Sequence, residues 1–72
     1  MATPTHTIRF IRLPEVIRTS GLSRSQIYRL CSSGRFPQSV KLGEATTAWV
    51  EAEVQRWCAA QVEVARSRET AA

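Results

Sequence analysis

The chain has 72 residues, 43% of them hydrophobic, so it has room for one small domain with a single core and not for two domains. The net charge of +4 is unevenly spread: residues 1–43 hold seven basic side chains and one acid, a net of +6, and residues 44–72 hold three basic side chains and five acids, a net of −2. Six of the seven basic residues in the first half are arginine, whose planar fork fits phosphates and guanine edges. This distribution favours nucleic acid as a partner, and a solvated basic surface without a ligand is the alternative.

Several classes of protein are excluded by what the sequence lacks. No run of about 18 apolar residues is present, so no segment is expected to span a membrane. Residues 1–7 lack the basic and apolar regions of a signal peptide, and we therefore expect a cytoplasmic protein. Cys31 and Cys58 are expected to be small buried thiols rather than a disulfide, and two cysteines with one histidine are too few for a zinc site. Without a glycine-rich phosphate loop, a Cys/His dyad or a recognisable carboxylate pair, we expect neither an enzyme nor a bound cofactor or metal.

In chain order, the first predicted elements are a strand and a short helix. Residues 8–13 nearly alternate apolar and basic side chains, which predicts a strand with Ile8 and Phe10 on one face. Pro14 suits the first position of the helix, where a missing N–H costs nothing, and Gly21 suits the turn that ends it. The side chains expected to pack inward from this helix are Leu13, Val16 and Ile17.

A second helix is predicted over residues 23–33. Ser23 suits the N-cap, and Gln26 three residues later completes a capping box. Gly34 suits the residue just after the helix, with Pro37 as a stop. The inward stripe, including a hydrophobic staple before the cap, is Leu22, Ile27, Leu30 and Cys31. The outward face is Arg24, Ser25, Gln26, Tyr28, Arg29 and Ser32.

The rest of the chain predicts a hairpin and a third helix. Val40 and Leu42 alternate with polar residues, and Thr46–Trp49 is β-prone, which predicts a hairpin with its tip at residues 43–45. From Val50 onward the sequence predicts a helix. Trp49, in the strand before it, and Trp57, in the helix, both fall on the apolar side of their elements and are expected in the core. The apolar stripe of this helix is Val50, Val54, Trp57, Cys58 and, one turn further, Gln61 and Val62.

These elements predict a small α+β fold. We expect a disordered arm at residues 1–7, a domain at 8–66 and a frayed tail at 67–72. Two helices joined by a tight glycine turn and followed by a hairpin form a winged helix-turn-helix with three helices and a β-hairpin wing. In this class the second helix lies in the major groove of DNA.

The residues expected to touch DNA fall into two classes. Base readout suits the long or polar side chains near the start of the second helix, Arg24, Ser25 and Gln26, and Arg29 one turn further on. Phosphate contact needs only a donor or a charge, which suits Ser23, Tyr28, Arg35 and Lys41. A purely structural role is the alternative for three residues: Ser23 as a cap, Gln26 as its capping partner, and Tyr28 as a cover for the core edge.

Several blocks of the sequence together resemble the AlpA family of prophage regulators. The blocks are Ile8–Val16, Thr19–Arg29, Gly34–Gly43, Trp49 and Glu53–Trp57, and they cover about residues 8–60. The family is similar to excisionases and to MerR-type proteins. The resemblance implies a small bacterial or phage DNA-binding protein that regulates transcription or directs excision. Carried over by position, the recognition helix holds Ser23, Arg24, Ser25, Tyr28 and Arg29, and the wing holds Lys41.

One departure from the family concerns the wing. Family members commonly carry a basic or small polar residue between the Leu-Gly pair and the tryptophan, whereas this chain has Glu44 and no arginine there. A carboxylate at the tip repels phosphate. Either the wing stays off the DNA backbone, or Thr46 and Thr47 supply neutral hydrogen bonds.

Three functions follow, in order of preference. The first is a sequence-specific regulator of a phage or mobile element that binds double-stranded DNA. The second is an excisionase-type architectural factor that bends DNA during recombination. The third is a protein-interaction module that uses the acidic C-terminal half and binds no DNA. One module offers a small interface, so self-association or cooperative binding on tandem sites is compatible with the sequence, while neither a membrane nor a small-molecule substrate is expected as a partner.

Overall fold

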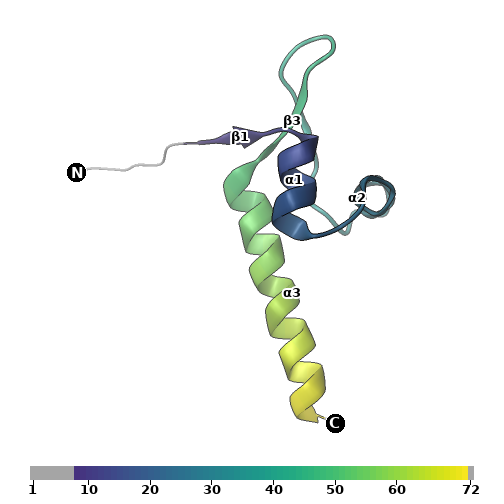
Figure 1. The fold of residues 1–72 in the computed structure, drawn as a ribbon, viewed down its shortest axis with the longest axis vertical. Helices are drawn as coiled ribbons and strands as arrows, with labels where there is room; N and C mark the ends of the chain where they lie inside the picture. Colours follow the sequence, from purple (N-terminus) through teal and green to yellow (C-terminus); the bar gives the residue numbers. More distant parts are fainter. Residues whose placement is uncertain (1–7, 72) are drawn as a thin grey trace, which may run out of the picture.

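The computed structural model describes residues 8–71, so the arm expected at residues 1–7 lies outside the described residues. In chain order the elements are β1 (Phe10–Ile11), α1 (Leu13–Ser20), α2 (Arg24–Ser32), β2 (Val40–Lys41), β3 (Thr47–Val50) and α3 (Glu51–Ala71). These elements confirm the predicted fold class, a winged helix-turn-helix. Figure 1 shows the β2–β3 hairpin and α3 extending in opposite directions from the centre of the domain.

The three strands form one antiparallel sheet in the order β1-β3-β2. The register places Ile11 opposite Trp49, and Lys41 opposite Thr47. The hairpin between β2 and β3 bends at residues 43–45, as the sequence predicts. Because β3 is central, it joins the start of the chain to the hairpin and then leads directly into α3.

The first strand is shorter than the prediction over residues 8–13. Helix α1 begins one residue before Pro14, so Pro14 takes the second helical position rather than the first. This costs little, because the first four N–H groups of a helix have no partner within the helix. Ile8 and Phe10 are 66% and 44% exposed, and the residue of this segment that enters the core is Ile11.

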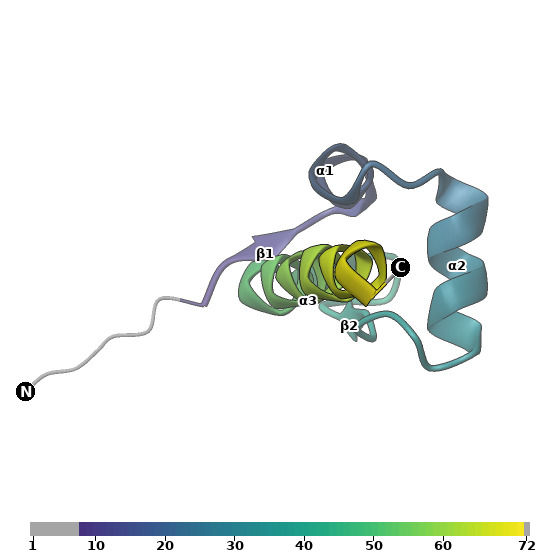
Figure 2. The ribbon, with the colours of Figure 1, turned by 90° about the horizontal axis from the view of Figure 1, so that it is seen from below.

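A short hydrogen-bonded turn connects α1 to α2. Gly21 has a φ of 76° and donates its N–H to the carbonyl of Ile17 at 2.9 Å. The Ser20 hydroxyl donates to the Val16 carbonyl and accepts from the N–H of Leu22. These bonds pair backbone groups that the end of α1 would otherwise leave unsatisfied. In Figure 2, α1 and α3 are seen end-on while α2 lies crosswise to both.

Both ends of α2 follow the sequence predictions. The hydroxyl of Ser23 accepts the backbone N–H of Gln26 at 3.2 Å, and the side-chain oxygen of Gln26 accepts the N–H of Ser23 at 2.9 Å, which completes the capping box. After the helix, Gly34 has a φ of 76°, and the N–H of Arg35 reaches back to the carbonyl of Leu30 at 2.8 Å. This pattern is a Schellman motif.

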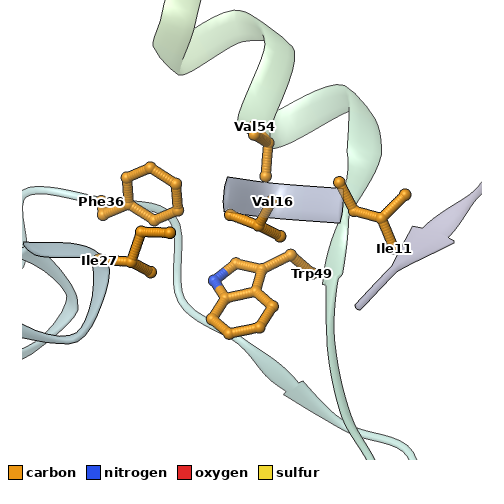
Figure 3. Packing of buried hydrophobic residues seen from close by; sticks show 6 residues of the cluster. All are labelled: Ile11, Val16, Ile27, Phe36, Trp49 and Val54. Carbon is orange, nitrogen blue, oxygen red and sulfur yellow. The ribbon is translucent and has the colours of Figure 1, made fainter. Parts of the chain in front are cut away.

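One hydrophobic cluster forms the core (Figure 3). Its buried members come from the three helices, from β1 and β3 and from the segment after α2, and are Ile11, Val16, Ile27, Phe36, Trp49 and Val54. Trp49 is 1% exposed, and its indole N–H donates to the Pro37 carbonyl at 3.1 Å. Trp57 is half-buried with its ring centroid 4.8 Å from that of Phe36. The predicted core positions of the two tryptophans are therefore confirmed, Trp57 at the margin.

The apolar stripe of α3 ends earlier than predicted. Cys58 is its last half-buried residue, whereas Gln61 is exposed and Val62 is 47% exposed. The stripe stops because α3 leaves the body of the domain beyond this point (Figure 1). The helix continues to Ala71, so the backbone at residues 67–71 is helical where the sequence suggested a frayed tail.

The two thiols are less buried than predicted. Cys31 and Cys58 are both half-buried and free. The Cys31 thiol lies 3.6 Å from the Pro37 carbonyl, and desolvation raises its pKa. Because each thiol contacts a backbone carbonyl at the edge of the core, we assign both to packing.

Gly34→Ala tests the left-handed turn after α2. A Cβ there meets no atom within 4 Å, so the expected loss of about 1–2 kcal/mol in unfolding free energy comes from backbone strain alone. Gly43→Ala is the matched control, since its nearest neighbour is Thr46 Oγ1 at 3.8 Å and its φ is not positive. It should change stability by less than about 0.5 kcal/mol. Urea denaturation measures both variants, and equal losses would contradict the turn geometry.

Candidate nucleic-acid interface

The exposed face of α2 is defined by what its opposite face buries. Ile27 is fully buried, and its neighbours on the same stripe pack against the core. With about 3.6 residues per turn, Ser25 and Arg29 project almost directly away from Ile27. Arg24 and Tyr28 lie together on the flank between these two faces. The packing of α2 against the core therefore determines which of its polar side chains are exposed to solvent.

Arg24 and Tyr28 form a stacked pair on that flank. The Arg24 guanidinium carbon lies 6.0 Å from the centroid of the Tyr28 ring. The two residues are one helical turn apart, which is the spacing at which side chains on a helix meet. Tyr28 remains 45% exposed, so both the guanidinium and the phenol face solvent. The pair holds a cation in place without neutralising it.

Ion pairs divide the arginines of the basic half into two groups. Arg9 and Arg18 each lie beside a glutamate, with nitrogen–oxygen distances of 3.9 and 2.7 Å. The hydrogen bond from Arg18 lowers the pKa of the Glu15 carboxyl below its ordinary value. Within the described residues, Arg24 and Arg29 have no carboxylate within 4 Å. The positive charge of α2 is therefore available to an external anion.

A hollow of about 490 Å³ separates α2 from the hairpin. Its walls come from α2, from the hairpin and from the start of α1, and the lining residues are Arg12, Leu13, Pro14, Tyr28, Ala45, Thr47 and Trp49. Lys41 pairs with Thr47 across the hairpin, and opposite residues share one face of a sheet. The hollow thus connects the flank of α2 that carries Tyr28 to the face of the hairpin that carries Lys41.

The structure brings most of the predicted site residues onto one element, α2. Those on its exposed surface are Arg24, Ser25, Gln26, Tyr28 and Arg29. The side-chain oxygens of Ser23 and Gln26 both accept backbone N–H groups in the capping box. The structural roles predicted for them, Ser23 as a cap and Gln26 as its partner, are therefore confirmed. Whether any of these side chains touches DNA stays a prediction.

The two remaining predicted residues lie apart from the start of α2. Arg35 is exposed beyond the C-terminal end of α2, and its carbonyl accepts the indole N–H of Trp57 at 2.7 Å. Lys41 is exposed on β2 and donates to the carbonyl of Glu44 at 3.2 Å, a bond that closes the hairpin tip. Lys41 lies opposite Thr47, which lines the hollow beside α2, whereas Arg35 follows the C-terminal end of α2.

The sequence patterns do not mark Arg12 as a site residue. It precedes α1 and lines the hollow because the β1–β3 pairing brings residues 10 and 11 beside residues 49 and 50. No local pattern reveals such a contact, which joins segments about 40 residues apart. The only sequence signal is the basic charge of the segment itself.

The described residues contain neither a candidate metal site nor a candidate membrane-spanning helix. Over the described residues, no three His, Cys, Asp or Glu side chains gather into a group that could hold a metal ion. No helix of residues 8–71 is both long and apolar enough to cross a membrane.

The fold defines a winged helix-turn-helix protein, and the second helix exposes two arginines that have no carboxylate within 4 Å among the described residues. Residues 9–62 match the family of the prophage CP4-57 regulatory protein (AlpA), and the chain belongs to this family. The resemblance read from the sequence blocks is thereby confirmed.

Two relatives illustrate the family. A protein of Enterobacteria phage P4, ORF88, whose function is uncharacterised, is 48% identical over 54 residues, covering 75% of this chain and 61% of the relative. The DNA-binding transcriptional activator AlpA of Escherichia coli strain K12 is 34% identical over 56 residues, covering 69% of this chain and 80% of the relative. The chain therefore spans less than two thirds of the phage P4 relative. No solved structure matches the chain.

Ser23→Ala separates the structural role of the cap from its neighbours. Removing the hydroxyl leaves the N–H of Gln26 without its acceptor, and the expected loss in unfolding free energy is about 1 kcal/mol. Ser25→Ala, also exposed and two positions away, is the matched control and should change stability by less than about 0.5 kcal/mol. Both are measured by urea denaturation. A Ser23 variant as stable as the Ser25 variant would contradict the capping box.

Proposed function

We propose that this chain is a transcriptional regulator of a phage or another mobile element and that it binds double-stranded DNA sequence-specifically. One observation carries the proposal. Helix α2 buries Ile27 completely, while Arg24 and Arg29 on its solvent side have no carboxylate partner among the described residues. A helix anchored in this way presents both arginines to the solvent.

The dimensions of DNA support this assignment. The major groove of B-form DNA is about 12 Å wide and admits one α-helix. Helix α2 lies at the periphery of the domain in Figure 2, with no described element covering its outer face. Its arginines are suited to the acceptor edge of guanine, and Ser25 to either kind of base pair. The net charge of +6 over residues 1–43 supplies the sequence-independent attraction.

The family relationship supports the same class of activity. The Escherichia coli relative is named as a DNA-binding transcriptional activator. The family match over residues 9–62 includes the whole of α2. We extend to this chain DNA binding and regulation, and leave the sign of regulation to experiment.

The test starts from a duplex selected out of a random pool by the wild-type protein. Arg24→Ala and Arg29→Ala should each raise the Kd for this duplex about 5- to 150-fold, because a bidentate base contact contributes about 1–3 kcal/mol. The increase for a random duplex should be smaller. Fluorescence anisotropy titrations over a range of salt concentrations measure both.

Arg56→Ala is the matched control for the loss of one positive charge, because Arg56 is exposed on α3. It should leave the preference for the selected duplex unchanged. If both α2 variants keep the wild-type Kd and salt slope, the assignment of α2 to the major groove is wrong. If the wild-type protein is not retained on any duplex at low salt, DNA binding itself is wrong and a protein-interaction role replaces it.

A further inference from the structure

We infer that the hollow between α2, the start of α1 and the hairpin seats one backbone phosphate of the bound DNA, with Arg12 as its cationic ligand. The inference rests on the proposed function, because it adds a strand contact beside the recognition helix. It assigns a role to Arg12, which belongs neither to α2 nor to the hairpin.

The lining of the hollow suits a sugar-phosphate strand. Arg12, Tyr28 and Thr47 all line the hollow, and their side chains carry a guanidinium and two hydroxyl groups. A charged donor flanked by neutral donors is the usual ligand set for a DNA phosphate. The remaining lining residues are apolar or small and offer a surface for deoxyribose: Leu13, Pro14, Ala45 and Trp49. At about 490 Å³ the hollow falls within the range of about 300–1,000 Å³ typical of ligand sites.

Arg12 differs from its neighbouring arginines in having no carboxylate. Arg9 and Arg18 are each held by a glutamate, whereas the described residues offer Arg12 no ion pair. Its backbone provides the N-cap of α1, but its side chain makes no capping hydrogen bond. Among the described residues, the Arg12 side chain therefore has no ion pair or capping bond that stabilises the fold. Its guanidinium is available to an anion.

The hollow also continues the basic surface of α2. Arg24 stacks on Tyr28, and Tyr28 forms one wall of the hollow. Thr47, which also lines the hollow, pairs with Lys41. Arg12 lines the same hollow as Tyr28 and Thr47, so it adds a cation to those carried by α2 and by the wing. A strand that leaves the groove occupied by α2 toward the hairpin would pass over Arg12.

From this position Arg12 contacts the phosphate backbone and not the base edges. It lies outside α2 and approaches the DNA from the start of α1. A phosphate contact positions the protein on the duplex but carries no base preference. Loss of Arg12 should therefore weaken binding to selected and random duplexes by the same factor.

Arg12→Ala tests the inference, with Arg18→Ala as the matched control that removes an arginine already paired with Glu15. The slope of log K against log salt should fall by about 0.9 for Arg12→Ala, the value for one phosphate, and stay unchanged for Arg18→Ala. Arg12→Lys should restore the slope, because the charge is retained. Urea denaturation of each variant shows that the fold is intact.

A methylphosphonate scan of the selected duplex locates the contact. Neutralising one particular phosphate should weaken binding of the wild type, while Arg12→Ala should be insensitive at that position and remain sensitive elsewhere. A wild-type salt slope for Arg12→Ala, together with weakened binding by Arg29→Ala, would overturn this inference and leave the proposed function standing. Failure of the wild type to bind any duplex would overturn both.

Discussion

The pairing of β3 with both β1 and β2 is the constraint on which the rest of the structure depends. On one side, Ile11 opposite Trp49 ties the start of the chain to the centre of the domain. On the other side, Lys41 opposite Thr47 fixes the hairpin. β3 then runs directly into α3 and also packs against α1, so a four-residue strand connects β1, the wing, α1 and α3. These strands are too short to be stable by themselves, and the core must hold them.

Trp49 links this sheet to the proposed function. Its side chain belongs to the core cluster with Ile27 of α2, and its indole N–H donates to the Pro37 carbonyl in the segment that follows α2. The same residue lines the hollow between α2 and the hairpin. Trp49, which lies on the hairpin strand β3, therefore packs in the same core cluster as Ile27 of α2.

The parts of the fold that depend on neighbours in sequence could be predicted, and those that depend on distant pairing could not. The capping box of Ser23 and Gln26 and the turn at Gly34 involve residues within about five positions, and the structure confirms them. Phe36 is buried in a segment without periodicity, so no pattern marked it as core. Arg12 reaches the hollow only through the β1–β3 register, which local patterns do not contain. For the same reason, the first strand is shorter than predicted, and the apolar stripe of α3 ends earlier than predicted.

Mapping of backbone amide chemical shifts during titration with a selected duplex tests the central claim most directly. The claim is that α2 and the hairpin together form the surface that meets DNA. It predicts that the shifted amides cluster at residues 23–32 and 41–47 and around Arg12, while those of α3 beyond Cys58, which leave the body of the domain, stay unchanged. Shifts centred on residues 59–71, or no shift at low salt, would contradict it.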